Sequence, residues 1–172
     1  MKTPLHILIL STGGTIEKTY DEADGSLDNR GTVISKLVKE KLRLPHTTIE
    51  VRSIMSKDSL NMTEEDRVFI CENIEESLRT KDHPIIVLHG TDTLMKTLEY
   101  CHQNLKNPKK PVIFTGAMKP VEFEKSDAMQ NIIEATILTR VLEPGFYLAF
   151  HNNIYKAPNA VKNHNTMTFD PT

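Results

Sequence analysis

The sequence lacks the features by which several large classes of protein are identified. Its unbroken apolar runs, such as residues 85–88 and 146–150, fall far below the roughly eighteen residues that a membrane-spanning helix needs. It also lacks an excess of positive charge, because 21 Lys and Arg residues stand against 23 Asp and Glu residues. No overall positive field exists to hold nucleic acid or an anionic membrane. We therefore expect neither a nucleic-acid partner nor a membrane.

Common motifs for nucleotides, metals and serine hydrolases are absent as well. The sequence contains no G-x-G-x-x-G and no G-x-x-x-x-G-K-[ST], which argues against dinucleotide and P-loop nucleotide sites. Its seven histidines are scattered, without H-x-x-x-H or Cys/His pairs at ligand spacing, so no metal site is expected. There is no G-x-S-x-G nucleophile elbow either.

Cysteine, glycine and proline are all scarce. Cys71 and Cys101 each fall on the apolar stripe of a predicted helix, which favours core packing over a disulfide or a nucleophile. With 7 Gly, 9 Pro and 38% apolar residues, the composition is not that of a disordered chain. No repeat or Pro/Ser-rich linker divides the 172 residues, so we expect one domain over residues 1–172. His6 interrupts the first apolar stretch and no cleavage site follows, so a cytoplasmic location is expected.

Apolar runs and helical spacing alternate along the chain. Five short apolar or β-branched runs predict strands at residues 6–10, 48–54, 84–88, 111–115 and 145–151. Apolar residues at helical spacing predict helices at residues 33–42, 63–79, 91–105 and 126–142. Most of the strands are continuously hydrophobic, so helices should cover both faces of the sheet. The fold class is therefore α/β, a doubly wound and mostly parallel sheet. Residues 48–54 alternate instead, as expected for an edge strand.

Local signals mark helix starts and two less regular segments. Thr63 precedes three acidic residues, and Ser126 precedes Asp127, so each hydroxyl is expected to cap a helix. Residues 16–31 are rich in Asp with few apolar anchors, which predicts an irregular loop able to serve as an active-site lid. Residues 152–172 are mostly polar, and the sequence leaves their order open.

Hydroxyls and glycines gather directly after three predicted strands. In an open parallel sheet, ligands bind beyond the carboxyl ends of the strands. The three segments are Ser11-Thr12-Gly13-Gly14-Thr15-Ile16, His89-Gly90-Thr91-Asp92-Thr93 and Thr115-Gly116-Ala117-Met118. Glycine allows close approach of backbone amides, and a threonine hydroxyl can donate a hydrogen bond or, beside a base, act as a nucleophile. These segments therefore predict a binding site at this edge of the sheet.

Each of these residues also has a simpler interpretation. Gly13 and Gly14 can serve only to make a tight turn. Asp92 can be a helix cap or a carboxylate that binds an ammonium group. For His89, a hydrogen-bonded structural histidine is favoured over a general base.

The first two of these segments resemble the signature segments of the bacterial-type L-asparaginases. The matching residues are Thr12-Gly13-Gly14-Thr15-Ile16 and His89-Gly90-Thr91-Asp92-Thr93. The similarity extends over nearly the whole chain, to Asp58-Ser59, Asn61-Met62-Thr63, residues 111–118, Ser126-Asp127-Ala128 with Asn131, and Lys162 with Phe169. The resemblance implies an α/β amidohydrolase that uses no cofactor.

The resemblance also implies catalytic roles for five residues. Thr15 would attack the substrate carboxamide to form an acyl-enzyme, and Tyr20 in the mobile loop would help to activate it. Lys162 and Asp92 would support the hydroxyl of Thr91. A threonine hydroxyl is a weak nucleophile at neutral pH, so it does need such a neighbouring base or relay.

Substrate contacts are implied in the same way. Asp92 would hold the ammonium group of the substrate and Ser59 its α-carboxylate, while Asp58 could add negative charge near the ammonium group. The remaining implied substrate contacts are Gly14, Thr15, Gly90, Thr91 and Ala117. Two positions depart from the family pattern: Leu60 replaces a common glutamine or serine, and Glu17 replaces a small residue.

The function expected from this resemblance is hydrolysis of L-asparagine to L-aspartate and ammonia, with glutamine as a poorer substrate. Two alternatives stay open: the amidase component of a tRNA-dependent amidotransferase, and a noncatalytic amino-acid-binding or regulatory domain. Typical family members carry an additional C-terminal domain. A layer that normally packs on another domain can leave apolar surface exposed, so we expect a homodimer or homotetramer.

Overall fold

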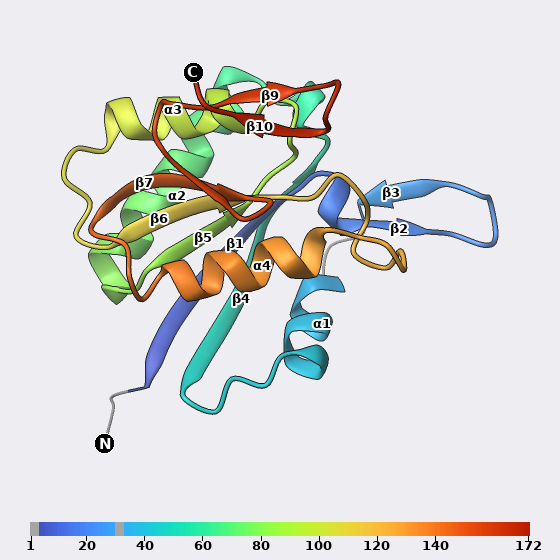
Figure 1. Cartoon of the computed structure of the whole chain (residues 1–172), viewed down its shortest axis with the longest axis horizontal. Coiled ribbons are helices and arrows are strands. Elements are labelled where there is room, and N and C mark those ends of the chain that lie inside the picture. Colours follow the sequence, from blue (N-terminus) through green and yellow to red (C-terminus); the bar gives the residue numbers. More distant parts are fainter. Residues whose placement is uncertain (1–3, 30–32) are drawn as a thin grey trace.

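A central sheet of mostly parallel strands organises the protein. The computed structural model describes residues 4–29 and 33–172. The sheet has six strands in the order β4-β1-β5-β6-β7-β8 (Figure 1). Their bounds are β1 Leu5–Gly13, β4 Thr47–Lys57, β5 Ile85–Leu88, β6 Pro111–Thr115, β7 Gly145–Phe150 and β8 Asn153–Lys156. Only β8 pairs antiparallel within this sheet, so the predicted fold class is confirmed, and β4 lies at an edge as expected.

Helices cover both faces of the sheet because the strands are apolar on both sides. Along β1, Leu8 and Leu10 face one hydrophobic cluster while Ile7 and Ile9 face the other. The first cluster contains side chains of α2 (Glu64–Lys81) and α3 (Leu94–Asn104), and the second contains those of α1 (Val33–Lys41) and α4 (Ala128–Leu138). Figure 1 shows the same two layers. The arrangement is that of a doubly wound sheet.

Cys71 and Cys101 are buried, free thiols in the cluster between α2, α3 and the sheet. Their expected role in core packing is therefore confirmed. No helix among residues 4–29 and 33–172 is long and apolar enough to cross a bilayer.

The two expected helix caps differ in detail. At α2, the Thr63 hydroxyl accepts a hydrogen bond from the Asp66 amide, and the Asp66 carboxylate accepts one from the Thr63 amide. This reciprocal pair is a capping box. Ahead of α4, the Ser126 hydroxyl accepts from the Ala128 amide at 3.1 Å, but the helix begins only at Ala128 and position 127 is its N-cap.

Two sequence expectations at the start of the chain need correction. The first strand runs to Gly13, so Ser11 and Thr12 belong to the strand rather than to a following turn, because β4 is long enough to pair with it there. The segment expected to be irregular, residues 16–31, instead forms a short 3-10 turn, η1 (Thr15–Glu17), and a hairpin of β2 (Lys18–Tyr20) and β3 (Leu27–Asn29) as far as residue 29. Residues 30 and 31 lie outside the described residues.

This hairpin projects away from the central sheet (Figure 1). Backbone hydrogen bonds join β2 to β3. At the tip of the hairpin, Gly25 has φ 72°, a conformation that glycine adopts without strain. Because its strands bury few side chains, they carry no hydrophobic pattern from which the sequence could have predicted them.

The polar segment 152–172 is folded. It contains β8 and a second hairpin made of β9 (Val161–Asn163) and β10 (Thr168–Asp170). Phe169 anchors this hairpin. The residue is 1% exposed, and the centroid of its ring lies 5.0 Å from that of Phe150 at the end of β7. The hairpin thus lies beyond the carboxyl ends of the parallel strands, where the candidate site is expected.

Candidate active site

Two glycine turns touch at the carboxyl ends of β1 and β5. A Cβ atom added to Gly14 would lie 2.5 Å from the nitrogen and Cα of Gly90, and Gly14 has φ 79°. A Cβ atom added to Gly90 would in turn lie 2.5 Å from the Ser59 hydroxyl oxygen. Both positions therefore require glycine. Thr15 and Thr91, which each follow one of these glycines, consequently flank the same backbone contact.

Thr91, Asp92 and Lys162 form a compact polar cluster beside this contact. The Lys162 ammonium group donates to the Thr91 hydroxyl oxygen at 2.8 Å and to the Asp92 carboxylate at 2.8 Å. Thr91 is 5% exposed, and the Lys162 side chain is 10% exposed. A lysine so far removed from water needs the opposite charge that Asp92 supplies. Asp92 is not a helix cap, because α3 begins later, with Thr93 as its N-cap.

The Thr91 hydroxyl also contacts the turn that follows β6. It donates to the sulfur of Met118 at 3.7 Å, in the turn that follows β6. Ala117, immediately before Met118, is buried, and its side chain belongs to the core on the α1 and α4 side. With 1% of the residue exposed, Ala117 offers little surface to a ligand in this structure.

Thr15 and Tyr20 are placed differently from this cluster. Thr15 lies in η1 and is partly exposed. Tyr20 lies on the projecting hairpin and is 58% exposed, with its hydroxyl 3.9 Å from the position that a Gly25 Cβ would take. Within the part of the chain that the structure describes, Tyr20 makes no hydrogen bond to Thr15.

Ser59 packs closely against Gly90, and Asp58 directly precedes it. The Lys18 ammonium group lies 2.9 Å from the Asp58 carboxylate, which also accepts the Leu60 amide at 3.1 Å. These two hydrogen bonds, with a weaker contribution from the charge of Lys162, lower the pKa of Asp58 and keep it ionised. Ser59 is 1% exposed and begins the short turn η2 (Ser59–Asn61), which Asp58 caps. Sequence reasoning missed Lys18, because its partner is 40 residues away.

His89 is a structural residue, as the sequence favoured. Its ring is fully buried, Nδ1 donates to the Gly90 carbonyl at 2.8 Å, and Nε2 accepts from the Thr97 hydroxyl at 2.8 Å. Burial lowers the pKa of His89 to about 4, so the ring is neutral at physiological pH. It fixes the backbone of Gly90 and has no face open to a ligand.

Glu17 is a second buried ionisable group near the site. It is 1% exposed, and one carboxyl oxygen has no hydrogen-bond partner among the residues described. Burial raises the pKa of Glu17, although contacts with Ser11 and the Gly13 backbone act in the opposite direction. Across the described chain, no group of three or more His, Cys, Asp or Glu residues is arranged to hold a metal ion.

Comparisons with known proteins identify a matching family model and similar structures. A family model described as Asparaginase, N-terminal, matches residues 6–170. The solved structure of the thermostable L-asparaginase from Thermococcus kodakarensis superposes with a TM-score of 0.88 at 32% identity, covering 97% of this chain and 51% of that one.

Curated relatives include both asparaginases and components of amidotransferases. L-asparaginase 1 of Escherichia coli K12 is 31% identical over 165 residues, which is 92% of this chain and 47% of that protein. A glutamyl-tRNA(Gln) amidotransferase component of Methanococcus vannielii is 30% identical over 151 residues, which is 87% of this chain and 35% of that protein. The chain thus spans about half the length of the two L-asparaginases named here.

Proposed function

Because the chain belongs to the asparaginase family, we propose that it hydrolyses L-asparagine to L-aspartate and ammonia through an acyl-enzyme on Thr15. The observation that carries this proposal is the cluster of Lys162, Thr91 and Asp92 beside the contact of Gly14 with Gly90. It combines a buried, polarised hydroxyl, a lysine and a carboxylate with a second hydroxyl on Thr15, a partly exposed residue.

In the proposed first step, the Thr15 oxygen attacks the carbon of the substrate carboxamide. The new C–O bond forms as the C–N bond breaks, the hydroxyl proton passes to the leaving nitrogen, and ammonia departs. The negative charge that develops on the carbonyl oxygen needs hydrogen-bond donors, each typically worth a factor of about 10² to 10³ in rate. Backbone amides of the glycine turns are the candidates.

In the second step, water attacks the ester carbon and releases L-aspartate, with its proton returning to the Thr15 oxygen. The hydrogen bond between Lys162 and Thr91 supports a role for this pair in activating the water, since a lysine that has lost its proton can accept one through the threonine hydroxyl. Asp92 then stabilises the lysine when it is protonated.

The charges around the site favour a small zwitterionic substrate. The Asp92 and Asp58 carboxylates can attract its ammonium group, and Ser59 can bind its carboxylate. The exposed position of Tyr20 supports a contribution only after the hairpin has moved toward Thr15, so we propose that substrate binding draws it in.

Ammonia release from L-asparagine and L-glutamine tests the proposal. We expect activity on asparagine that is lost in Thr15→Ala and partly retained in Thr15→Ser. Thr19→Ala, in the neighbouring hairpin, is the matched control and should retain activity. An unchanged rate in Thr15→Ala would refute Thr15 as the nucleophile. Asparagine binding measured by calorimetry without any ammonia release would instead favour a noncatalytic binding domain.

A second candidate is the amidase component of a tRNA-dependent amidotransferase, because relatives with that name match most of this chain. Activation of ammonia release by a partner protein with aminoacylated tRNA would favour it, whereas full activity of the isolated chain would not. We further propose that the chain is cytoplasmic and assembles as a homodimer or homotetramer. A monomer in light scattering at micromolar concentration would contradict this assembly.

A further inference from the structure

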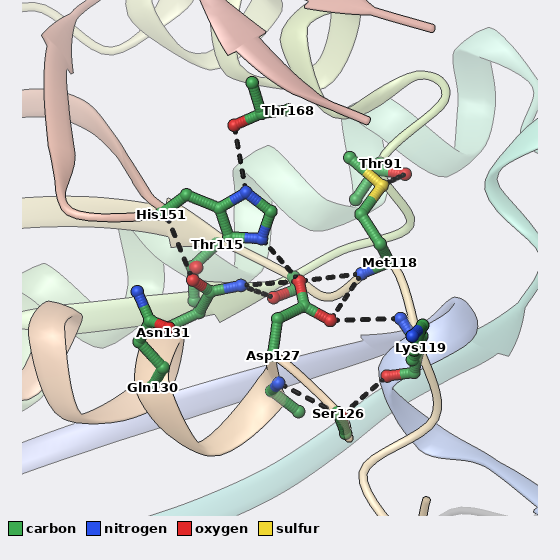
Figure 2. A network of polar contacts seen from close by, with 12 residues as sticks. Thr91, Thr115, Met118, Lys119, Ser126, Asp127, Gln130, Asn131, His151 and Thr168 are labelled. Atoms are coloured by element: carbon green, nitrogen blue, oxygen red, sulfur yellow. Dashed lines mark hydrogen bonds and ion pairs between the residues drawn. The ribbon is translucent and has the colours of Figure 1, made fainter. Parts of the chain in front are cut away.

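The Asp127 carboxylate collects hydrogen bonds from three separate segments. It accepts from the backbone amides of Met118, at 2.9 and 3.0 Å, and Lys119, at 3.1 Å. It also accepts from the Asn131 side-chain amide at 3.1 Å and from the His151 ring at 2.9 Å (Figure 2). All of these groups donate, so both carboxylate oxygens act as acceptors. Asp127 thereby fixes the turn after β6 to the turn after β7.

His151 continues this network on its other side. Nε2 of the ring donates to Asp127, and Nδ1 lies within hydrogen-bond distance, 3.0 Å, of the Thr168 hydroxyl oxygen. The backbone of His151 has φ 48°, an uncommon conformation for a residue with a side chain, and its amide donates to the Asn131 side chain at 3.1 Å. His151 therefore stands in a fixed place and orientation between Asp127 and Thr168.

Thr168 belongs to the hairpin that carries Lys162. In the register of β9 and β10, Phe169 pairs with Lys162, and Thr168 pairs with Asn163. Phe169 anchors the hairpin by its buried ring, and its carbonyl accepts a short hydrogen bond from the Tyr155 hydroxyl at 2.6 Å. The bond from Thr168 to His151 adds a polar attachment one residue away, and this attachment faces the β6 turn.

Two neighbours of the Thr91 hydroxyl are thus joined through one side chain. Lys162 reaches Thr91 from the hairpin, and Met118 reaches it from the turn after β6. His151 connects the two segments through Thr168 on one side and Asp127 on the other. We propose that His151 is a positioning residue that, through Thr168, holds Lys162 on the Thr91 hydroxyl. The inference rests on the proposed amidohydrolase function for its kinetic consequence.

A small displacement of Lys162 is expected to be costly. The rate of an enzyme can fall by about 10² when a reacting group is misplaced by roughly 1 Å. Loss of the Thr168 hydroxyl leaves the Phe169 anchor in place, so the hairpin should loosen without detaching. We therefore expect kcat to fall by about tenfold while KM changes little, since the substrate contacts proposed above include neither His151 nor Thr168.

The test compares Thr168→Val with Thr168→Ser. Valine keeps the shape and removes the hydroxyl, whereas serine keeps the hydroxyl, so serine should restore most of kcat. The matched control is Thr166→Val, an exposed threonine of the same hairpin outside the site. Removing the ring in His151→Ala should lower kcat at least as much as Thr168→Val does. The free energy of unfolding of each variant, measured in urea, separates positioning from a general loss of stability.

A separate readout makes the inference testable even if the wild-type protein releases no ammonia, which would refute the proposed function alone. Hydrogen exchange of the 161–170 amides should be faster in Thr168→Val than in Thr168→Ser or Thr166→Val. Equal exchange in all three variants would overturn the proposed link between His151 and the hairpin. Faster exchange together with an unchanged kcat in an active enzyme would overturn its role in positioning Lys162.

Discussion

Acidification should expose the energetic cost of burying His89. The ring is fully buried, and burial lowers its pKa from 6.5 to about 4. The unfolded chain therefore binds a proton at a pH where the folded protein does not. The contribution of this histidine to stability is complete above pH 6.5, falls as the pH drops toward 4, and is constant below that.

The size of this effect follows from the same two pKa values. At about 1.4 kcal/mol for each pH unit, lowering the pKa from 6.5 to about 4 makes unfolding easier by about 3 kcal/mol across that interval. Such a loss is a large part of the roughly 5 to 15 kcal/mol that is typical for a whole domain. The protein should therefore become markedly less stable between neutral and mildly acidic pH.

Urea unfolding of wild type and His89→Gln at several pH values isolates the contribution of His89 protonation to the free energy of unfolding. Glutamine does not titrate, and its amide can still donate to the Gly90 carbonyl and accept from Thr97. The stability of the wild type should consequently fall by about 3 kcal/mol more than that of the variant over the same pH interval. Parallel curves for the two proteins would refute the argument. An NMR titration that showed His89 gaining its proton near pH 6.5 would refute it as well.

Three further substitutions test the surroundings of the site. Gly14→Ala would place a Cβ 2.5 Å from the backbone nitrogen and Cα of Gly90, at a residue whose φ is 79°. The free energy of unfolding, measured by thermal unfolding, should therefore fall by roughly 1–3 kcal/mol, and ammonia release should fall as well. Glu17→Gln should raise the melting temperature at pH 8 more than at pH 5, because burial raises the pKa of Glu17 and disfavours its charged form; an equal effect at both pH values would contradict this. Lys18→Met should raise the pKa of Asp58, measured by NMR of its carboxyl carbon, and an unmoved titration would show that their hydrogen bond is not maintained in solution.

The central sheet could be predicted because its strands are buried on both faces. Residues such as Ile7, Leu8, Ile9 and Leu10 form a continuous apolar run, and this pattern is local in the sequence. The hairpins 18–29 and 161–170 have three-residue strands that bury few side chains, so no comparable pattern marks them. Phe169 is a buried apolar anchor that could have indicated order in the final segment.

The candidate site was predictable only in part, for the same reason. The turns after β1 and β5 are local combinations of glycine and threonine at strand ends, and the topology brings Gly14 and Gly90 into contact. Lys162 comes from a segment 70 residues beyond Asp92, and only the family resemblance pointed to it. The network around His151 unites side chains from several segments, and no sequence spacing encodes such a meeting.

The identity of the nucleophile is the central claim, and mass spectrometry of acid-quenched enzyme tests it most directly. Wild type and Lys162→Met would be mixed with L-asparagine, quenched within milliseconds to seconds, digested and searched for an aspartyl ester. We predict that the ester is found on the peptide containing Thr15, that it accumulates in Lys162→Met, where its hydrolysis is slowed, and that it is absent from Thr15→Ala. An aspartyl ester on Thr91, or turnover of asparagine with no ester at any time, would contradict the account.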